Sequence, residues 1–151
     1  MEPRIQYAQT KDGVDIAYWT VGQGTPLVHL VNFPWSHLEL EWRDPQRRPW
    51  YERLAEKRTL IRYDPRGTGL SDRHATEFSL DAHVLDLEAV VDRLDLKRLD
   101  LLGSLPSGPV AVAYAARHPD RVSRLILWCT SANPAATFDP SLVRSMLSLA
   151  E

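Results

Sequence analysis

Leu99-Asp100-Leu101-Leu102-Gly103-Ser104-Leu105-Pro106-Ser107-Gly108 is the stretch of sequence that decides the fold. Residues 99–102 form a mostly apolar run, as expected of a buried strand, and residues 108–117 are small and helix-forming. The pattern predicts a strand that turns directly into a helix, with Gly103 giving the two elements room to approach closely. The central residue of the turn is Leu105.

Strands and helices alternate along the rest of the chain. The patterns predict a hairpin of residues 5–8 and 14–21, strands at 27–31, 59–63, 99–102 and 122–129, and helices at 50–57, 80–94, 110–117 and from Asp139 onward. Ser79 is the predicted N-cap of the second helix. The order predicts an α/β fold, a three-layer α/β/α sandwich with a mostly parallel sheet and an N-terminal antiparallel hairpin. Residues 1–151 are predicted to form one domain, in which 136–151 begin a cap or covering helix.

The composition is that of an ordinary globular protein. The chain has 151 residues, 44% of them hydrophobic, and a formal net charge of −2. This charge favours neither a nucleic-acid nor a membrane partner. The start of the chain has no apolar signal segment, so a cytoplasmic protein is expected. Cys129 is the single cysteine and is predicted to pack as a small hydrophobic residue.

The segment Asp64-Pro65-Arg66-Gly67-Thr68-Gly69-Leu70-Ser71 follows the fourth predicted strand. Together with Phe33-Pro34 and the order of elements over residues 5–135, it resembles the N-terminal half of an α/β-hydrolase. Within that superfamily the chain is similar to bacterial hydrolase-like modules, some of which are joined to helix-turn-helix or nucleotide-cyclase domains. The resemblance implies that Asp64 and Arg66 form a structural pair, and that Gly67, Gly69 and Ser71 shape the same loop.

The resemblance also implies that residues 103–107 are the nucleophile elbow, whose usual pattern is G-x-S-x-G. Leu105 stands where the serine is expected. The next residue, Pro106, has no N–H to donate to an oxyanion, and Val31-Asn32 replaces the family's His-Gly. Loss of one oxyanion donor costs about 10²- to 10³-fold in turnover. The family places its acid and histidine on later strands, and the sequence stops at Glu151.

Two serines beside the elbow tip are alternative nucleophiles. Ser104 or Ser107 would lie near the positive end of the following helix, but a serine without a base is a weak nucleophile. Turn formation and capping are the simpler roles, and Ser107 suits a cap because Gly108-Pro109 follows it. No histidine occupies a recognisable base position: His29 lies in a strand, His37 in a loop, His74 after the motif, His83 in a helix and His118 at a helix end.

An aromatic cluster surrounds the loop that would border the pocket: Phe33, Trp35, Trp42, Trp50 and Tyr51. Large aromatic side chains suit a ligand site, although core packing explains them equally well. The predicted binding residues are Phe33, Trp35, Leu105 and Pro106. No cofactor or metal site is predicted: the turn matches no phosphate motif, and Asp81, His83 and Asp86 are read as a solvated helix face.

An apolar strand at the open edge of the sheet favours association. The resemblance places residues 123–128, from Ser123 to Trp128, beside strands that the sequence does not contain. This edge should be covered by the terminal helix, paired with another copy or completed by a separate chain, and self-association of the 151-residue chain is expected. The function predicted is binding of a small apolar ligand or a partner protein at a degenerate hydrolase site. The alternative is a weak serine ester hydrolase that uses Ser104 or Ser107 and is completed by another chain. Whether the protein is an enzyme is left open.

Overall fold

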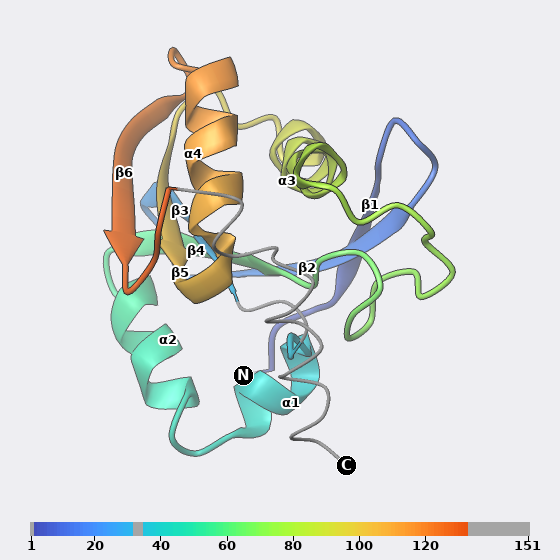
Figure 1. The fold of residues 1–151 in the computed structure, drawn as a ribbon. Coiled ribbons are helices and arrows are strands. Elements are labelled where there is room, and N and C mark those ends of the chain that lie inside the picture. The colour runs from blue at the N-terminus through green and yellow to red at the C-terminus, as the bar shows by residue number, and fades with distance from the viewer. Residues whose placement is uncertain (1, 32–34, 133–151) are drawn as a thin grey trace.

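The computed structural model describes residues 2–31 and 35–132 (Figure 1). Phe33 and the helix predicted from Asp139 lie outside the described residues. The strands are β1 (Gln6–Gln9), β2 (Asp15–Val21), β3 (Thr25–Leu30), β4 (Arg58–Tyr63), β5 (Leu99–Ser104) and β6 (Val122–Trp128). The helices are α1 (Leu38–Arg43), α2 (Arg48–Ala55), α3 (Leu80–Arg93), the short 3₁₀ helix η1 (Leu105–Ser107) and α4 (Gly108–Arg117).

The six strands form one sheet in the order β1-β2-β4-β3-β5-β6. β2 pairs antiparallel with β1 and β4, whereas the β4–β3, β3–β5 and β5–β6 pairs are parallel. Helices α1 and α2 cover one face of the sheet, and α3 and α4 cover the other (Figure 1). The predicted three-layer arrangement with an N-terminal hairpin is therefore confirmed. Among the described residues, none of the helices is long and apolar enough to span a membrane.

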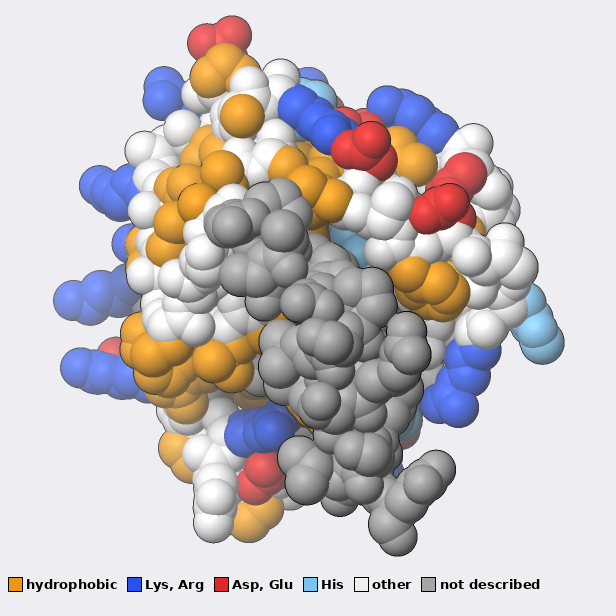
Figure 2. Space-filling model, viewed as in Figure 1, with side chains coloured by type: hydrophobic (Ala, Val, Ile, Leu, Met, Phe, Trp, Pro, Cys, Tyr) orange, Lys and Arg blue, Asp and Glu red, His pale blue; other side chains and the backbone are white. Residues whose placement is uncertain are grey.

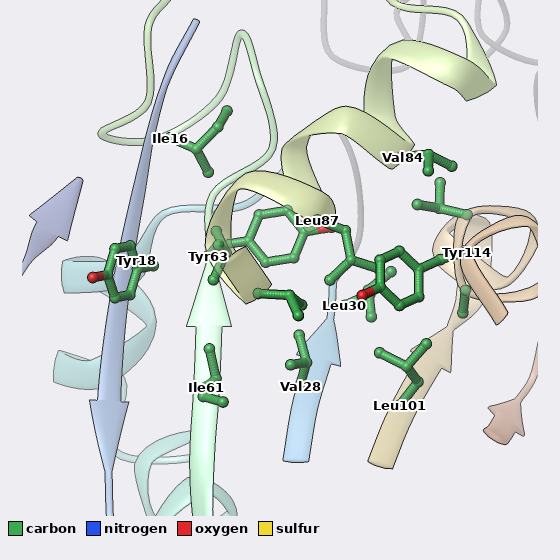
Figure 3. Close-up of a cluster of buried hydrophobic side chains, with 14 of the residues drawn as sticks. Ile16, Tyr18, Val28, Leu30, Ile61, Tyr63, Val84, Leu87, Leu101 and Tyr114 are labelled. Carbon is green, nitrogen blue, oxygen red and sulfur yellow. The ribbon is translucent and has the colours of Figure 1, made fainter. Parts of the chain in front are cut away.

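Each face of the sheet has its own hydrophobic core. On the face of α3 and α4, Figure 3 shows Leu87 and Tyr114 packed over side chains of the central strands. On the opposite face, Trp19 of β2 meets Trp42 and Tyr51 edge-on, with ring centroids 5.6 and 5.7 Å apart. Most residues of the central strands β3, β4 and β5 are buried, among them the charged Arg62 and Asp100.

Ser79 caps α3 as predicted, since its side chain accepts a hydrogen bond from the amide of Ala82 at 3.2 Å. Helix α1 was not expected from the sequence, because its six residues alternate charged and apolar types and are too few to show a helical period. Its cap is His37, whose ring nitrogen accepts from the amide of Leu40 at 3.5 Å.

The prediction that Cys129 is a buried hydrophobic residue is wrong. β6 ends at Trp128, and Cys129 is exposed in the turn that follows, with a positive φ of 50°. The cause is that β6 is the last strand of the sheet, so its outer side is not covered by a further strand in the described part of the chain.

The loop after β4 is organised by the buried carboxylate of Asp64. It accepts hydrogen bonds from the Ser36 hydroxyl at 2.6 Å, the Leu38 amide at 3.2 Å and the Leu70 amide at 2.9 Å. Gly69 is required beside it: φ is +49°, and a Cβ would lie 2.0 Å from Asp64 Oδ2. The carboxylate thus fixes both the start of α1 and the glycine loop.

Arg66 is structural, as predicted, but its partners are other than Asp64. Its guanidinium bonds Asp86 Oδ1 of α3 at 2.8 Å and Asp12 Oδ2 of the hairpin at 2.7 Å. The Arg66 guanidinium lowers the pKa of Asp12 to about 2. Asp86 is buried, as is His83, so these residues do not form the solvated helix face that the sequence suggested.

The remaining motif residues are also structural. The Ser71 hydroxyl donates to the Asp64 carbonyl at 2.5 Å and accepts from the Ala17 amide at 2.9 Å, which ties the loop to β2. Gly67 has a φ of +75° and lies against the ring of Phe78. The loop motif therefore shapes the fold around the elbow without supplying a reactive group to it.

Candidate functional site

The structure places Leu105 at the tip of the elbow. β5 runs through Ser104, Leu105 then turns with a φ of +51°, and α4 begins at Gly108. A non-glycine residue in this left-handed region is strained by about 1 kcal/mol or more. Gly103 lets β5 and α4 approach, since a Cβ there would lie 2.9 Å from the Cβ of Ala111. The strained backbone of a nucleophile elbow is thus present with a leucine at its tip.

This strain makes a prediction for Leu105→Gly. Glycine adopts a positive φ without strain. The stabilisation from releasing the strain should exceed the free-energy cost of ordering a more flexible residue. The free energy of unfolding, measured by urea titration, should therefore rise by about 0.5 to 1 kcal/mol. Leu40, exposed on α1, is the matched control. Leu40→Gly should destabilise the protein by about 1 kcal/mol. An unchanged or lower stability for Leu105→Gly contradicts the strain.

Ser107 is held by backbone groups rather than by a catalytic partner. Its buried hydroxyl accepts from the Ser104 amide at 3.0 Å and lies 3.0 and 2.8 Å from the carbonyl oxygens of Leu30 and Ser104. Ser107 occupies the predicted N-cap position of α4, but its side chain makes no hydrogen bond to that helix. Ser107 instead closes the 3₁₀ turn that precedes α4.

Ser104 lies next to His29 of β3. The Ser104 hydroxyl oxygen is 3.4 Å from His29 Nε2 and 3.3 Å from the Leu30 carbonyl oxygen, and both side chains are buried. Burial lowers the pKa of His29 well below its usual value, and the nearby Arg62 guanidinium lowers it further. The imidazole is therefore neutral at physiological pH. The sequence showed His29 only as a strand residue, because the parallel pairing of β3 with β5 is what brings it to Ser104.

A cavity of about 560 Å³ lies over these residues. Its described walls are Val31, Trp35, Gln46, Arg47, Trp50, Leu105 and Trp128, and its most buried lining residues are His29, Glu41, Tyr51 and Ser104. The predicted binding residues Trp35 and Leu105 do line it. Pro106 borders a much smaller hollow of about 20 Å³. Trp42 belongs to the core under α1, so the aromatic cluster divides between the cavity and the core.

A buried ion pair lies beneath the cavity. Glu41 Oε2 accepts from the Tyr51 hydroxyl at 2.6 Å and from Nη2 of Arg62. Burial raises the pKa of Glu41, because a buried carboxylate loses its hydration. The Arg62 charge and these hydrogen bonds outweigh the effect of burial, so the pKa of Glu41 is lowered overall. The two opposite charges cancel inside the protein. Among the described residues, no group of three His, Cys, Asp or Glu side chains is placed to hold a metal ion.

The alpha/beta hydrolase fold family model matches residues 37–150, and the chain belongs to this family. It is 31% identical over 135 residues to the AB hydrolase superfamily protein YisY of Bacillus subtilis (strain 168), covering 89% of this chain and 48% of that protein. The solved esterase EaEST from Exiguobacterium antarcticum matches with a TM-score of 0.72 and 31% identity, over 84% of this chain and 46% of that one.

A hydrolase from Pseudomonas aeruginosa PA01 matches with a TM-score of 0.75 and 29% identity, over 95% of this chain and 53% of that one. The chain thus spans about half the length of these proteins. The comparisons support the α/β-hydrolase fold predicted from the sequence, and the curated relatives include proteins named as hydrolases.

Proposed function

We propose that this protein binds a small apolar ligand in the cavity over the elbow and does not carry out efficient ester hydrolysis there. The observation that carries the proposal is Leu105, which occupies the strained elbow tip and lines the cavity with an unreactive side chain. Pro106 follows it and lacks the amide that would stabilise an oxyanion. The elbow therefore contributes apolar surface where a hydrolase needs a nucleophile and a donor.

The cavity has the features of a ligand site. Its volume falls within the range of about 300 to 1,000 Å³ that small-molecule sites occupy. Trp35, Trp50 and Trp128 are 59, 38 and 58% exposed, so their rings offer contact area that the fold itself does not bury. Such rings suit an apolar ligand, because burying aromatic surface is favourable and costs little side-chain entropy. The concave shape favours a small molecule over a partner protein.

Calorimetric titration with 2-methoxynaphthalene, an uncharged aromatic probe, tests the proposal. The wild-type protein should bind it, and Trp128→Ala should weaken binding about tenfold because a large contact surface is removed. Tyr7→Ala is the control, since Tyr7 is an exposed aromatic residue on β1 that does not line the cavity. No binding to the wild type, or equal binding by the two variants, contradicts the proposal.

A second candidate function is weak ester hydrolysis by Ser104, favoured by its 3.4 Å approach to His29 Nε2. His29 would accept the hydroxyl proton while Oγ bonds to the acyl carbon, and would return the proton to the departing alkoxide as the ester C–O bond breaks. Water would then release the acyl group. In this candidate function the base would be His29 of the same chain, so no base from another chain would be required.

Labelling with a fluorophosphonate, followed by peptide mapping, separates the two functions. We expect no adduct on the native protein, because the Ser104 hydroxyl lies within reach of the Leu30 carbonyl and the base is weakened by burial. Labelling of Ser104 that is lost on denaturation and in Ser104→Ala establishes the second candidate. It would overturn the proposal that the site is not catalytic.

A further inference from the structure

One nitrogen of His29 is buried without a partner. Nδ1 makes no hydrogen bond in the described structure, although the residue is only 4% exposed and lines the cavity. Buried polar atoms are nearly always hydrogen-bonded, because an unmet one loses its water and gains nothing in return. An orphaned ring nitrogen beside a cavity is therefore a place where a ligand's polar group would be held.

The surroundings of Ser104 indicate which group Nδ1 needs. The Ser104 hydroxyl donates to the Leu30 carbonyl oxygen at 3.3 Å, so its single proton is not available to His29. We therefore assign the ring proton to Nε2 of His29, which lies 3.4 Å from the same hydroxyl oxygen and would donate to it. A neutral imidazole has one N–H, which leaves Nδ1 as a bare acceptor. Its missing partner is a hydrogen-bond donor.

The charged side chains that the structure describes around the cavity are paired with one another, which disfavours a charged ligand. Glu41 faces the buried Arg62, and Arg47 lies 3.7 Å from Glu41 and 3.5 Å from Asp44. Two positive and two negative groups thus offset one another. A charged ligand would give up its hydration without meeting an uncompensated opposite charge, which is unfavourable in a partly enclosed site.

We propose that the ligand is an uncharged aromatic or alicyclic alcohol whose hydroxyl group donates to Nδ1 of His29. The inference rests on the proposed function of the cavity. Its ring would lie among Trp35, Trp50 and Trp128, all of which line the site. The Trp50 ring meets His29 edge-on, with centroids 4.9 Å apart, and is 38% exposed. Nδ1 has almost no exposed surface, so the proposed hydrogen bond requires a neighbouring side chain such as the Trp50 ring to move aside as the alcohol enters.

Calorimetry at neutral pH with three naphthalene probes tests the ligand class. 2-Naphthol has the donor, 2-methoxynaphthalene has the same ring without it, and 2-naphthoate carries a charge. A hydrogen bond to a buried acceptor predicts about tenfold tighter binding of 2-naphthol than of the methoxy probe. His29→Leu should abolish this difference by weakening 2-naphthol alone, whereas Trp128→Ala should weaken both neutral probes equally.

The outcomes distinguish the two proposals. Equal affinities for 2-naphthol and its methyl ether overturn the role of His29 and leave the apolar cavity site intact. If 2-naphthoate binds more tightly than the two neutral probes, the ligand is not uncharged and that part of the proposal is overturned. If none of the three probes binds, the proposed function itself is overturned. If His29→Leu does not fold, ¹⁵N spectra of the wild-type imidazole decide the matter. The signal of the unprotonated Nδ1 must shift on adding 2-naphthol and stay in place with 2-methoxynaphthalene.

Discussion

Glu41→Gln is expected to lower the free energy of unfolding by about 3 kcal/mol, because it leaves the Arg62 guanidinium buried without a counter-charge. Arg62 is completely buried, and its Nε has no hydrogen-bond partner in the described structure. The Glu41 carboxylate joins Arg62 of β4 to Tyr51 of α2, so the variant weakens the link between α1, α2 and the sheet. Urea titration followed by circular dichroism measures the loss.

Two control variants isolate the buried charge. Glu41→Gln combined with Arg62→Met removes both charges and should be more stable than Glu41→Gln alone, since apolar replacements of a buried pair are often neutral. Glu52→Gln breaks the exposed pair with Arg48, whose atoms lie 2.8 Å apart, and should cost less than about 1 kcal/mol. If the double variant is less stable than Glu41→Gln alone, the uncompensated charge of Arg62 is not the cause of the lost stability.

The same ion pair makes stability depend on pH. The pKa of Glu41 in the folded protein lies below its ordinary value of 4.5, so the unfolded chain binds a proton more readily than the folded one. The stabilisation is complete above about pH 4.5 and is lost as the pH falls further, through the folded pKa. Between pH 6 and 3 the melting temperature should therefore fall more steeply for the wild type than for Glu41→Gln.

The sheet and its long helices were predictable because their patterns are local. Ser79 and the apolar spacing after it define α3, and the apolar run before Gly103 defines β5. The elbow tip was also correctly located at Leu105, since the strand-to-helix transition fixes the position of the turn. The six residues of α1 were missed because their helix is held by the Asp64 carboxylate and the core, which no local pattern records.

The chemistry of the site depended on contacts between distant residues. His29 and Ser104 are 75 positions apart and meet only through the pairing of β3 with β5. Arg66 similarly finds Asp12 and Asp86 in elements that precede and follow its own loop. A single sequence predicts that such groups are polar and near strand ends. It does not predict which of them meet, because the register of the sheet decides that.

The exposed edge of β6 carries the second large prediction. Leu125, Ile126, Leu127 and Trp128 are 38 to 58% exposed, and hydrophobic side chains gather on the side of the molecule where β6 lies (Figure 2). Their side chains point alternately to the two faces of the sheet. The Leu127 side chain lies beside Gly103 of the neighbouring strand β5. Strands paired in parallel are normally buried on both faces, and residues 2–31 and 35–132 do not provide that cover for β6.

We expect a second copy of the chain to pair along this edge. Two β6 strands related by a two-fold axis run antiparallel, and pairing centred on Ile126 places Leu125 opposite Leu127. Arg124, the one charged residue of β6, then lies opposite Trp128 rather than opposite its own copy. Apolar cross-strand pairs and a cation over an indole ring are both favourable, and no like charges face one another.

We therefore expect the isolated chain to sediment with the mass of two chains and Ile126→Lys to sediment as one. A lysine at the centre of the pairing sets two positive charges opposite each other, while in the single chain it remains at a position that is 43% exposed. Leu40→Lys, at an exposed site on α1, should leave the dimer unchanged. A wild type that stays monomeric at high concentration and binds no hydrophobic dye would show that β6 does not associate. Because Trp128 belongs to both the cavity and this edge, 2-methoxynaphthalene should bind the dimer and the Ile126→Lys monomer with different affinities.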